Sequence, residues 1–145
     1  MKRRITVLAL ALAAVFATAT PAQAAPQRPR STSFIAFMNG HNEVPPADPD
    51  ATGVAMFSLK RNGQLCWVIF THKVDGTITG AHIHANPTGV VVVPLSTAHV
   101  GCTWVDKKLA RSLRMYPMGF YVNVHSTVWP KGALRGQLMK AGSSH

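Results

Sequence analysis

The residues whose spacing best suits chemistry are two histidines, His82 and His84, which are separated only by Ile83. In a β-strand, successive side chains point to opposite faces of the sheet, so the two imidazoles would share one face while Ile83 takes the other. A His-x-His pair on a strand therefore presents two nitrogen donors side by side. We expect a polar site on this face.

A second segment alternates in the same way. Val122 and Val124 favour a buried face, and Tyr121, Asn123 and His125 then lie together on the opposite face. The two segments thus carry three histidines in two polar rows. We predict that these rows meet and form the functional site.

Three imidazoles that converge from two strands suit copper or zinc, for which imidazole is a natural ligand. The predicted metal ligands are His82, His84 and His125. Such a site needs neutral imidazoles, and the second ring nitrogen of each must be held by a neighbouring acceptor. Four polar side chains are predicted to hold the rings or bind a ligand: Glu43 from a proline-stiffened loop, Tyr121, Asn123 and Arg135.

The same residues admit two other interpretations. Buried polar groups need hydrogen-bond partners in any protein, so His82, His84, Asn123 and Arg135 could form a closed, metal-free network that ties the strands together. The other is a metal-dependent redox enzyme of superoxide-dismutase-like or cupin-like type. Against it, only three histidines are well placed, and the carboxylate that a cupin carries shortly after its second histidine is missing from residues 85–89. No nucleophile with an acid and a base is evident, so we expect a protein without catalytic activity.

The remaining histidines are weaker candidates. His72 precedes a turn and is expected at an exposed strand end, whereas His41 lies beside the Glu43 loop and could reach the site from above. His99 and His145 are expected to face solvent.

Strands and turns must position the polar rows. Asn62-Gly63 lies between two β-rich runs, residues 54–60 and 64–73, and predicts a hairpin between antiparallel neighbours. Asp106 as N-cap, with Leu109 and Leu113 on one face, predicts one short helix over about residues 106–115. Further strands are predicted around His82 and over residues 33–39, 90–95, 120–126 and 133–140. About seven or eight short strands joined by turns indicate an all-β fold, an antiparallel sandwich or small barrel.

The beginning of the chain predicts export. A basic start, an apolar stretch from Ile5 to about Ala17 and a small-residue motif ending at Ala24 are typical of a secretory signal peptide over residues 1–24. The apolar stretch is shorter than the roughly 20 residues of a membrane-spanning helix, so we expect no transmembrane segment in the mature chain. Residues 25–32 are predicted to be a flexible leader, 33–140 a single domain and 141–145 a disordered tail.

The chain is basic, with 15 basic and 5 acidic residues and a formal charge of +10. Lys2, Arg3 and Arg4 leave with the signal peptide, so 12 basic residues (15 minus 3) and a charge of +7 remain. A basic surface favours anionic partners such as a cell-surface polymer, and an extracellular protein is an alternative partner. We expect no nucleic acid as a partner, because an exported protein seldom meets it and no basic–aromatic motif is present.

Only two cysteines occur, Cys66 and Cys102. Disulfides persist in exported proteins, so we predict that the two are bonded. Closing a loop between positions 66 and 102 would stabilise the fold by about 3–4 kcal/mol in the chain-entropy model.

Four short motifs occur in an order that resembles the CHRD family: Glu43-Val44-Pro45-Pro46, Ala81-His82-Ile83-His84, Tyr121-Val122-Asn123-Val124-His125, and Gly132 with Arg135-Gly136-Gln137. The resemblance extends from about Phe34 to Leu138. CHRD is the domain repeated in chordin and found alone in many secreted bacterial proteins. The resemblance implies a single-domain secreted bacterial member with an immunoglobulin-like or superoxide-dismutase-like β-sandwich or barrel.

Together, these observations predict a secreted, non-catalytic CHRD binding module with a histidine site for copper or zinc. The alternative that stays open is a metal-free domain that binds an extracellular protein or the cell surface and uses its histidines as a hydrogen-bond network.

Overall fold

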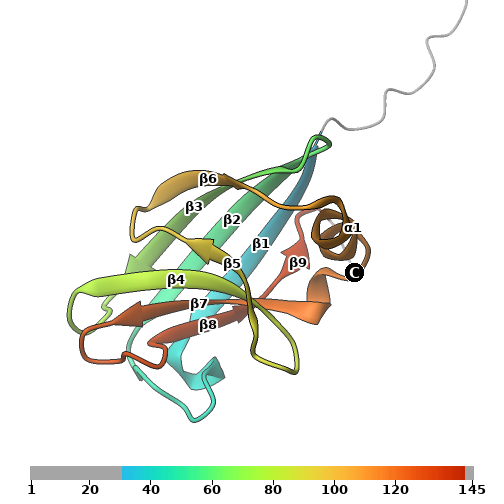
Figure 1. Ribbon diagram of the computed structural model, residues 1–145. Coiled ribbons are helices and arrows are strands. Elements are labelled where there is room, and N and C mark those ends of the chain that lie inside the picture. The colour runs from blue at the N-terminus through green and yellow to red at the C-terminus, as the bar shows by residue number, and fades with distance from the viewer. Residues whose placement is uncertain (1–30, 143–145) are drawn as a thin grey trace, which may run out of the picture.

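The computed structural model of the protein describes residues 31–142. This part of the chain forms nine strands, one α-helix and two 3-10 helices (Figure 1). The strands are β1 (Ser31–Asn39), β2 (Thr52–Lys60), β3 (Gln64–His72), β4 (Ile78–Ala85), β5 (Val91–Leu95), β6 (Val100–Trp104), β7 (Phe120–Ser126), β8 (Leu134–Gln137) and β9 (Met139–Lys140). The helices are α1 (Lys107–Met115) and the 3-10 helices η1 (Gly40–Asn42) and η2 (Pro117–Gly119).

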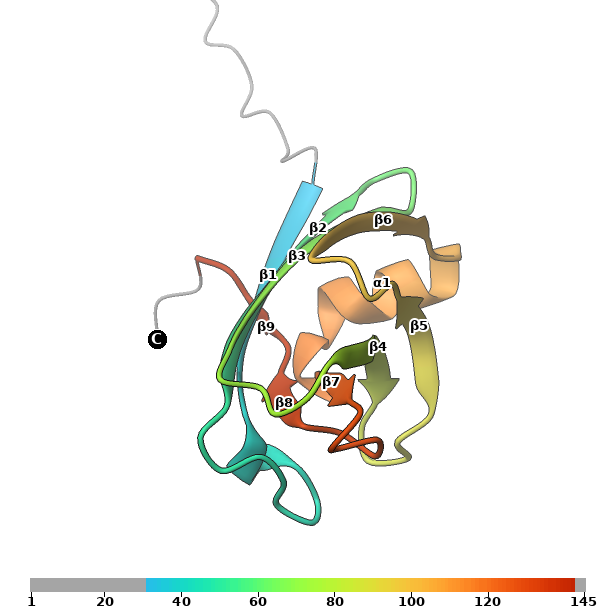
Figure 2. The same cartoon turned by 90° about the vertical axis from the view of Figure 1, so that its left-hand side faces the viewer.

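The strands form one antiparallel sheet in the order β5-β4-β7-β8-β1-β2-β3-β6, and β9 pairs with β1. The sheet curls into a nearly closed barrel, with β5 and β6 as its two end strands (Figure 2). Helix α1 lies at one end of the barrel (Figure 1). The predicted all-β antiparallel barrel with one short helix is therefore confirmed.

The core lies inside the barrel and is built from alternate residues of β1, β2 and β3 together with buried residues of β4, β5, β7, β8 and α1. In β1, Phe34, Ala36 and Met38 are buried, while Phe37 between them is 59 % exposed. Apolar and polar residues alternate only loosely in the sequence of β1, but buried and more exposed side chains alternate strictly from Phe34 to Met38 in the structure. Each strand of the barrel therefore has one inner and one outer face, and the outer faces carry the polar rows.

Helix α1 begins where the sequence predicted. The Asp106 side chain caps it by accepting the N–H of Leu109 at 2.8 Å. Ala110 and Leu113 are buried and belong to the hydrophobic core. The helix thus packs its apolar side against the strands.

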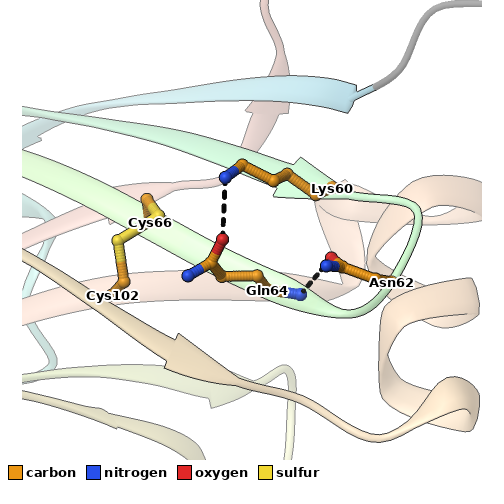
Figure 3. The surroundings of a disulfide bond; sticks show 5 residues. All are labelled: Lys60, Asn62, Gln64, Cys66 and Cys102. Carbon is orange, nitrogen blue, oxygen red and sulfur yellow. Dashed lines mark hydrogen bonds between the residues drawn. A yellow bond between two sulfur atoms is a disulfide. The ribbon is translucent and has the colours of Figure 1, made fainter.

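Strands β2 and β3 form the predicted hairpin. In its turn, Asn62 Oδ1 accepts the N–H of Gln64 at 3.1 Å, and Gly63 has φ +96°, a conformation that favours glycine. Farther along β3, Cys66 lies directly opposite Cys102 of β6. The two form the predicted disulfide, which joins the end strand β6 to its neighbour (Figure 3).

Two predictions about strands need correction. No strand was predicted over Val100–Trp104, yet these residues form β6. This end strand has no buried residue, so it shows no hydrophobic periodicity. The single strand predicted over residues 133–140 is two strands, β8, which pairs with β7, and β9, which pairs with β1; Leu138 between them is fully buried and donates its N–H to the carbonyl of Phe120.

Strand β1 begins two residues before the predicted start of the domain at residue 33. Ser31 and Thr32, which were assigned to the leader, already pair with Lys60 and Leu59 of β2. The predicted signal peptide over residues 1–24, residues 25–30 of the leader and residues 143–145 of the tail lie outside the described residues. Within residues 31–142, no helix combines the length and apolar character needed to cross a membrane.

Candidate metal centre

The two polar rows lie on the outer faces of β4 and β7, which are neighbouring antiparallel strands (Figure 1). Ile83 of β4 is fully buried in the core, so His82 and His84 on either side of it point outward. On β7, Asn123 lies directly opposite His82, and His125 follows two residues later on the same face. The cluster therefore extends along one face of two adjacent strands, over the pairs Gly80–His125, His82–Asn123 and His84–Tyr121.

The structure brings the three predicted ligands together. One ring nitrogen from each of His82, His84 and His125 lies within 4.8 Å of the others. His82 Nδ1 is 3.0 Å from His125 Nε2, and the ring centroids of His82 and His84 are 5.6 Å apart. His84 is only 8 % exposed, whereas the other two rings are half-buried. The cluster is thus open to solvent on one side.

Backbone carbonyls hold the outer ring nitrogens of two histidines. His84 Nδ1 donates to the carbonyl of Gly89 at 2.8 Å, and His125 Nδ1 donates to the carbonyl of Pro130 at 3.0 Å. A carbonyl can only accept, so each Nδ1 must carry the hydrogen. In the neutral ring this leaves the lone pair on Nε2, which points into the cluster.

Asn123 lies at the centre of the cluster. Its Oδ1 is 2.8 Å from His84 Nε2 and 3.1 Å from His125 Nε2. Its amide nitrogen faces the other way and donates to the Glu43 carboxyl. Asn123 and Glu43 are 4 % and 8 % exposed, so both are held in place by the fold. The Glu43 loop therefore lies beside the cluster and contacts it through Asn123.

Tyr121 and Arg135 form a stack beside the cluster. The rings of Tyr121 and His84 are parallel within 3°, with centroids 4.9 Å apart. The guanidinium carbon of Arg135 lies 3.5 Å from the centroid of the Tyr121 ring, a cation–π contact. Arg135, Tyr121 and His84 therefore form one continuous stack at the edge of the cluster.

The local pKa values follow from burial. Burial lowers the pKa of His82, and the neighbouring rings of His125 and His84 lower it further. Burial also lowers the pKa of His125, although its hydrogen bond to a backbone carbonyl opposes the shift. The two rings are thus neutral at pH 7, the state that binds a metal ion. For Glu43, burial raises the carboxyl pKa more than the Arg135 guanidinium lowers it.

The other described histidines lie outside the cluster. His72 is exposed at the end of β3, as predicted, and His41 is exposed in η1 and does not join the three-histidine group. His99 is exposed as well, and its Nδ1 donates to the carbonyl of Ile69 at 3.0 Å. His145 lies outside the described residues.

Sequence reasoning missed the two backbone carbonyls that hold the rings. In both cases the carbonyl lies five residues after the histidine, His84 to Gly89 and His125 to Pro130. Each histidine is near the end of its strand, and a turn containing proline and glycine follows. The turn sequences indicate that the chain reverses after each histidine, but they do not specify which carbonyl accepts the ring hydrogen.

The CHRD domain profile matches residues 34–138. The chain belongs to the CHRD family. The match runs from β1 to the residue before β9, so this CHRD domain contains the whole histidine cluster, the Glu43 loop and Arg135. No curated protein and no solved structure matches the chain.

The donor set of this CHRD domain fits a transition metal. Zinc binds imidazole nitrogen at about 2.0–2.1 Å, which places the ligands of a tetrahedral ion about 3.3 Å from one another. The contact between His82 Nδ1 and His125 Nε2, 3.0 Å, is close to that separation. The largest separation in the group, 4.8 Å, would need to shorten by rotation of a ring. Imidazole donors suit zinc and copper, whereas calcium and magnesium prefer oxygen.

Proposed function

We propose that this CHRD domain is an extracellular, non-catalytic binding module that holds one copper or zinc ion at His82, His84 and His125. The observation that carries the proposal is the fixed tautomer of two rings. Because backbone carbonyls take the Nδ1 hydrogens of His84 and His125, both Nε2 lone pairs point toward a common space. A neighbouring acceptor that fixes the ring in this way is the usual companion of a metal-binding histidine.

The surroundings of the cluster support a binding role over covalent catalysis. The hydrogen-bond partners of the three rings in the described structure are one another, Asn123 and two carbonyls. No serine, threonine or cysteine of residues 31–142 is among them, whereas activation of a nucleophile needs a base within hydrogen-bond distance of it. The redox alternative predicts metal-dependent turnover of superoxide by the loaded protein.

Two observations support an extracellular location. The disulfide between Cys66 and Cys102 is of a kind that persists in oxidising compartments. The first 24 residues have the composition of a secretory signal peptide.

The proposal is tested by metal analysis of protein purified without an affinity tag. After incubation with copper or zinc and removal of excess ion, we expect one equivalent per chain by mass spectrometry of the elements. His41→Ala, at an exposed histidine outside the cluster, should bind the same amount, and His125→Ala should bind none. Protein that takes up neither ion would favour the metal-free network, and superoxide turnover by the loaded protein would favour the redox enzyme.

A second candidate function, association with a partner protein, is favoured by the outer face of β1, β2, β3 and β6. The strand register aligns apolar side chains in two rows across these strands: Phe37, Val54 and Phe70 in one row, and Ile35, Met56, Val68 and Val100 in the next. Phe37, Phe70 and Val100 are 59 %, 58 % and 63 % exposed. Contiguous apolar surface of this kind marks an interaction site.

We infer that the occupant of this face is a second copy of the chain. The two rows contain no charged side chain, although a formal charge of +7 remains on the chain after removal of residues 1–24. The positive charges of two copies repel each other, and this repulsion is smallest when the copies meet through a face without charged side chains. Two sheet faces can also pack with interdigitated side chains at about 10 Å.

Sedimentation at several protein concentrations tests the dimer. We expect the wild type to associate and the double variant Phe37→Asp/Phe70→Asp to stay monomeric with an unchanged circular dichroism spectrum. The control is Tyr116→Asp, at an exposed aromatic outside the two rows. A wild type that stays monomeric at all concentrations would exclude the second copy as the occupant.

A further inference from the structure

Asn123 Oδ1 occupies a position among the imidazole nitrogens that resembles that of a ligand. It lies 2.8 Å from His84 Nε2 and 3.1 Å from His125 Nε2, and His82 Nδ1 lies 3.0 Å from the same His125 nitrogen. Ligands of one tetrahedral ion lie about 3.3 Å apart when the bonds are about 2.0–2.1 Å. We propose that the amide oxygen of Asn123 is the fourth ligand of the metal ion, a step that rests on the proposed metal-binding function.

The hydrogens of the cluster support this position. His84 and His125 each give the Nδ1 hydrogen to a backbone carbonyl, so their neutral rings have only a lone pair at Nε2. The amide oxygen between them has lone pairs and no hydrogen either. The amide oxygen therefore faces the Nε2 lone pairs of His84 and His125 at hydrogen-bond distance without a proton between them. A divalent cation at their centre turns this repulsion into coordination.

The orientation of the amide is set by Glu43. The Asn123 amide nitrogen donates to the Glu43 carboxyl, and the backbone N–H of Val44 bonds to the same carboxyl. If the amide were turned over, its oxygen would face the Glu43 carboxyl, and the hydrogen bond from the amide nitrogen to this carboxyl would be lost. Glu43 thus directs the Asn123 oxygen toward the imidazoles and acts as a positioning residue for the fourth ligand.

Two metal-free arrangements compete with coordination. In one, an extra hydrogen on His84 Nε2 would be donated to Asn123 Oδ1. In the other, the amide is turned over, and its nitrogen donates to His84 and His125. Neither arrangement needs a metal ion, and neither brings the amide oxygen into contact with one.

A crystal structure of the zinc-loaded full domain, with anomalous data at the zinc edge, separates these possibilities. We expect one zinc ion bound by His82, His84 and His125, with Asn123 Oδ1 at about 2.0–2.2 Å. Zinc on the three histidines with water in the fourth position, and the amide oxygen out of bonding range, would overturn the role of Asn123 and leave the proposed function intact. The absence of zinc from the cluster would overturn both.

Solution measurements on two variants give a second test. Asn123→Asp keeps an oxygen donor at the same position, and Asn123→Leu keeps the approximate size of the side chain without a donor. With cobalt as a spectroscopic substitute for zinc, we expect Asn123→Asp to retain the visible spectrum of a four-coordinate ion and Asn123→Leu to lose it. The zinc affinity of Asn123→Leu should fall by at least about 10–100-fold.

The matched control is Asn42→Leu, the same substitution at an exposed asparagine whose side chain donates to the carbonyl of Arg135. Its cobalt spectrum and zinc affinity should equal those of the wild type. If Asn123→Leu, folded by circular dichroism, also binds cobalt with the wild-type spectrum, the amide oxygen is not a ligand. The crystal structure of the wild type decides the question if neither Asn123 variant folds.

Discussion

Replacement of His84 by alanine perturbs both the metal site and the hydrogen-bond network. The His84 ring is 8 % exposed and meets Gly89 and Asn123 at 2.8 Å through its two nitrogens. One face of the ring also stacks on Tyr121, with centroids 4.9 Å apart. Alanine removes all three contacts at once and leaves the strand that carries them unchanged.

The expected loss of stability follows from these contacts. The carbonyl of Gly89 lies in an exposed turn, where water can replace the lost donor. In both metal-free arrangements of the Asn123 amide, the buried amide is hydrogen-bonded to His84, and a buried group left without its partner costs about 1–3 kcal/mol. The stacked ring pair adds about 0.5–1.5 kcal/mol. We therefore expect His84→Ala to lower the unfolding free energy of the metal-free protein by about 1.5–4.5 kcal/mol.

Urea denaturation in the presence of a chelator, followed by tryptophan fluorescence, measures this change. The slope of free energy against urea should stay constant, because the variant exposes the same surface on unfolding. Zinc at about 100 times its dissociation constant should then stabilise the wild type by about 2.7 kcal/mol and leave the variant unchanged. His72→Ala, at an exposed strand end, is the matched control and should respond to zinc as the wild type does.

Two results would refute the reasoning. A metal-free His84→Ala protein within about 0.5 kcal/mol of the His72→Ala control would show that the His84 contacts do not hold the strands together. An equal zinc-induced gain in the variant and the wild type would show that His84 is not a ligand.

Three further predictions concern the disulfide, the histidines and the Glu43 loop. Reduction should lower the unfolding free energy by about 3–4 kcal/mol, because the bond closes a loop between residues 36 positions apart; an unchanged melting temperature in dithiothreitol would contradict this. In the folded protein the pKa values of His82 and His125 are lower than the histidine pKa of about 6.5 in the unfolded chain. Their contribution to stability is therefore present above about pH 6.5 and is lost as the pH falls through the folded pKa values. Urea denaturation of the metal-free protein from pH 7.5 downward should show this loss, and the double variant with glutamine at both positions should show less of it; equal pH dependence in both proteins would exclude these rings as the cause. Gly132→Ala should cost more than about 1 kcal/mol, because Gly132 has φ +138° and a methyl group there would overlap Glu43 Oε1. The control is Gly119→Ala, whose added carbon meets no atom within 4 Å, and equal melting temperatures of the two variants would contradict the prediction.

Local patterns in the sequence were sufficient to predict most of the strands, the main hairpin and the helix. Strand alternation follows from backbone geometry, so the shared face of His82 and His84 could be predicted without knowing what lies next to it. The Asn62-Gly63 turn and the Asp106 cap are equally local. The end strand β6 was not predictable in this way, because a strand without a buried face has no hydrophobic period.

The sequence by itself determined which residues could form the site: three histidines and Asn123 on the polar faces of two strands, and a single possible disulfide. The tertiary structure decided that β4 and β7 are neighbours, that carbonyls of the following turns hold two of the rings, and that Asn123 Oδ1 points between them. These features depend on strand pairing and loop paths, which are set by packing of the whole core and leave no periodic signal in the chain.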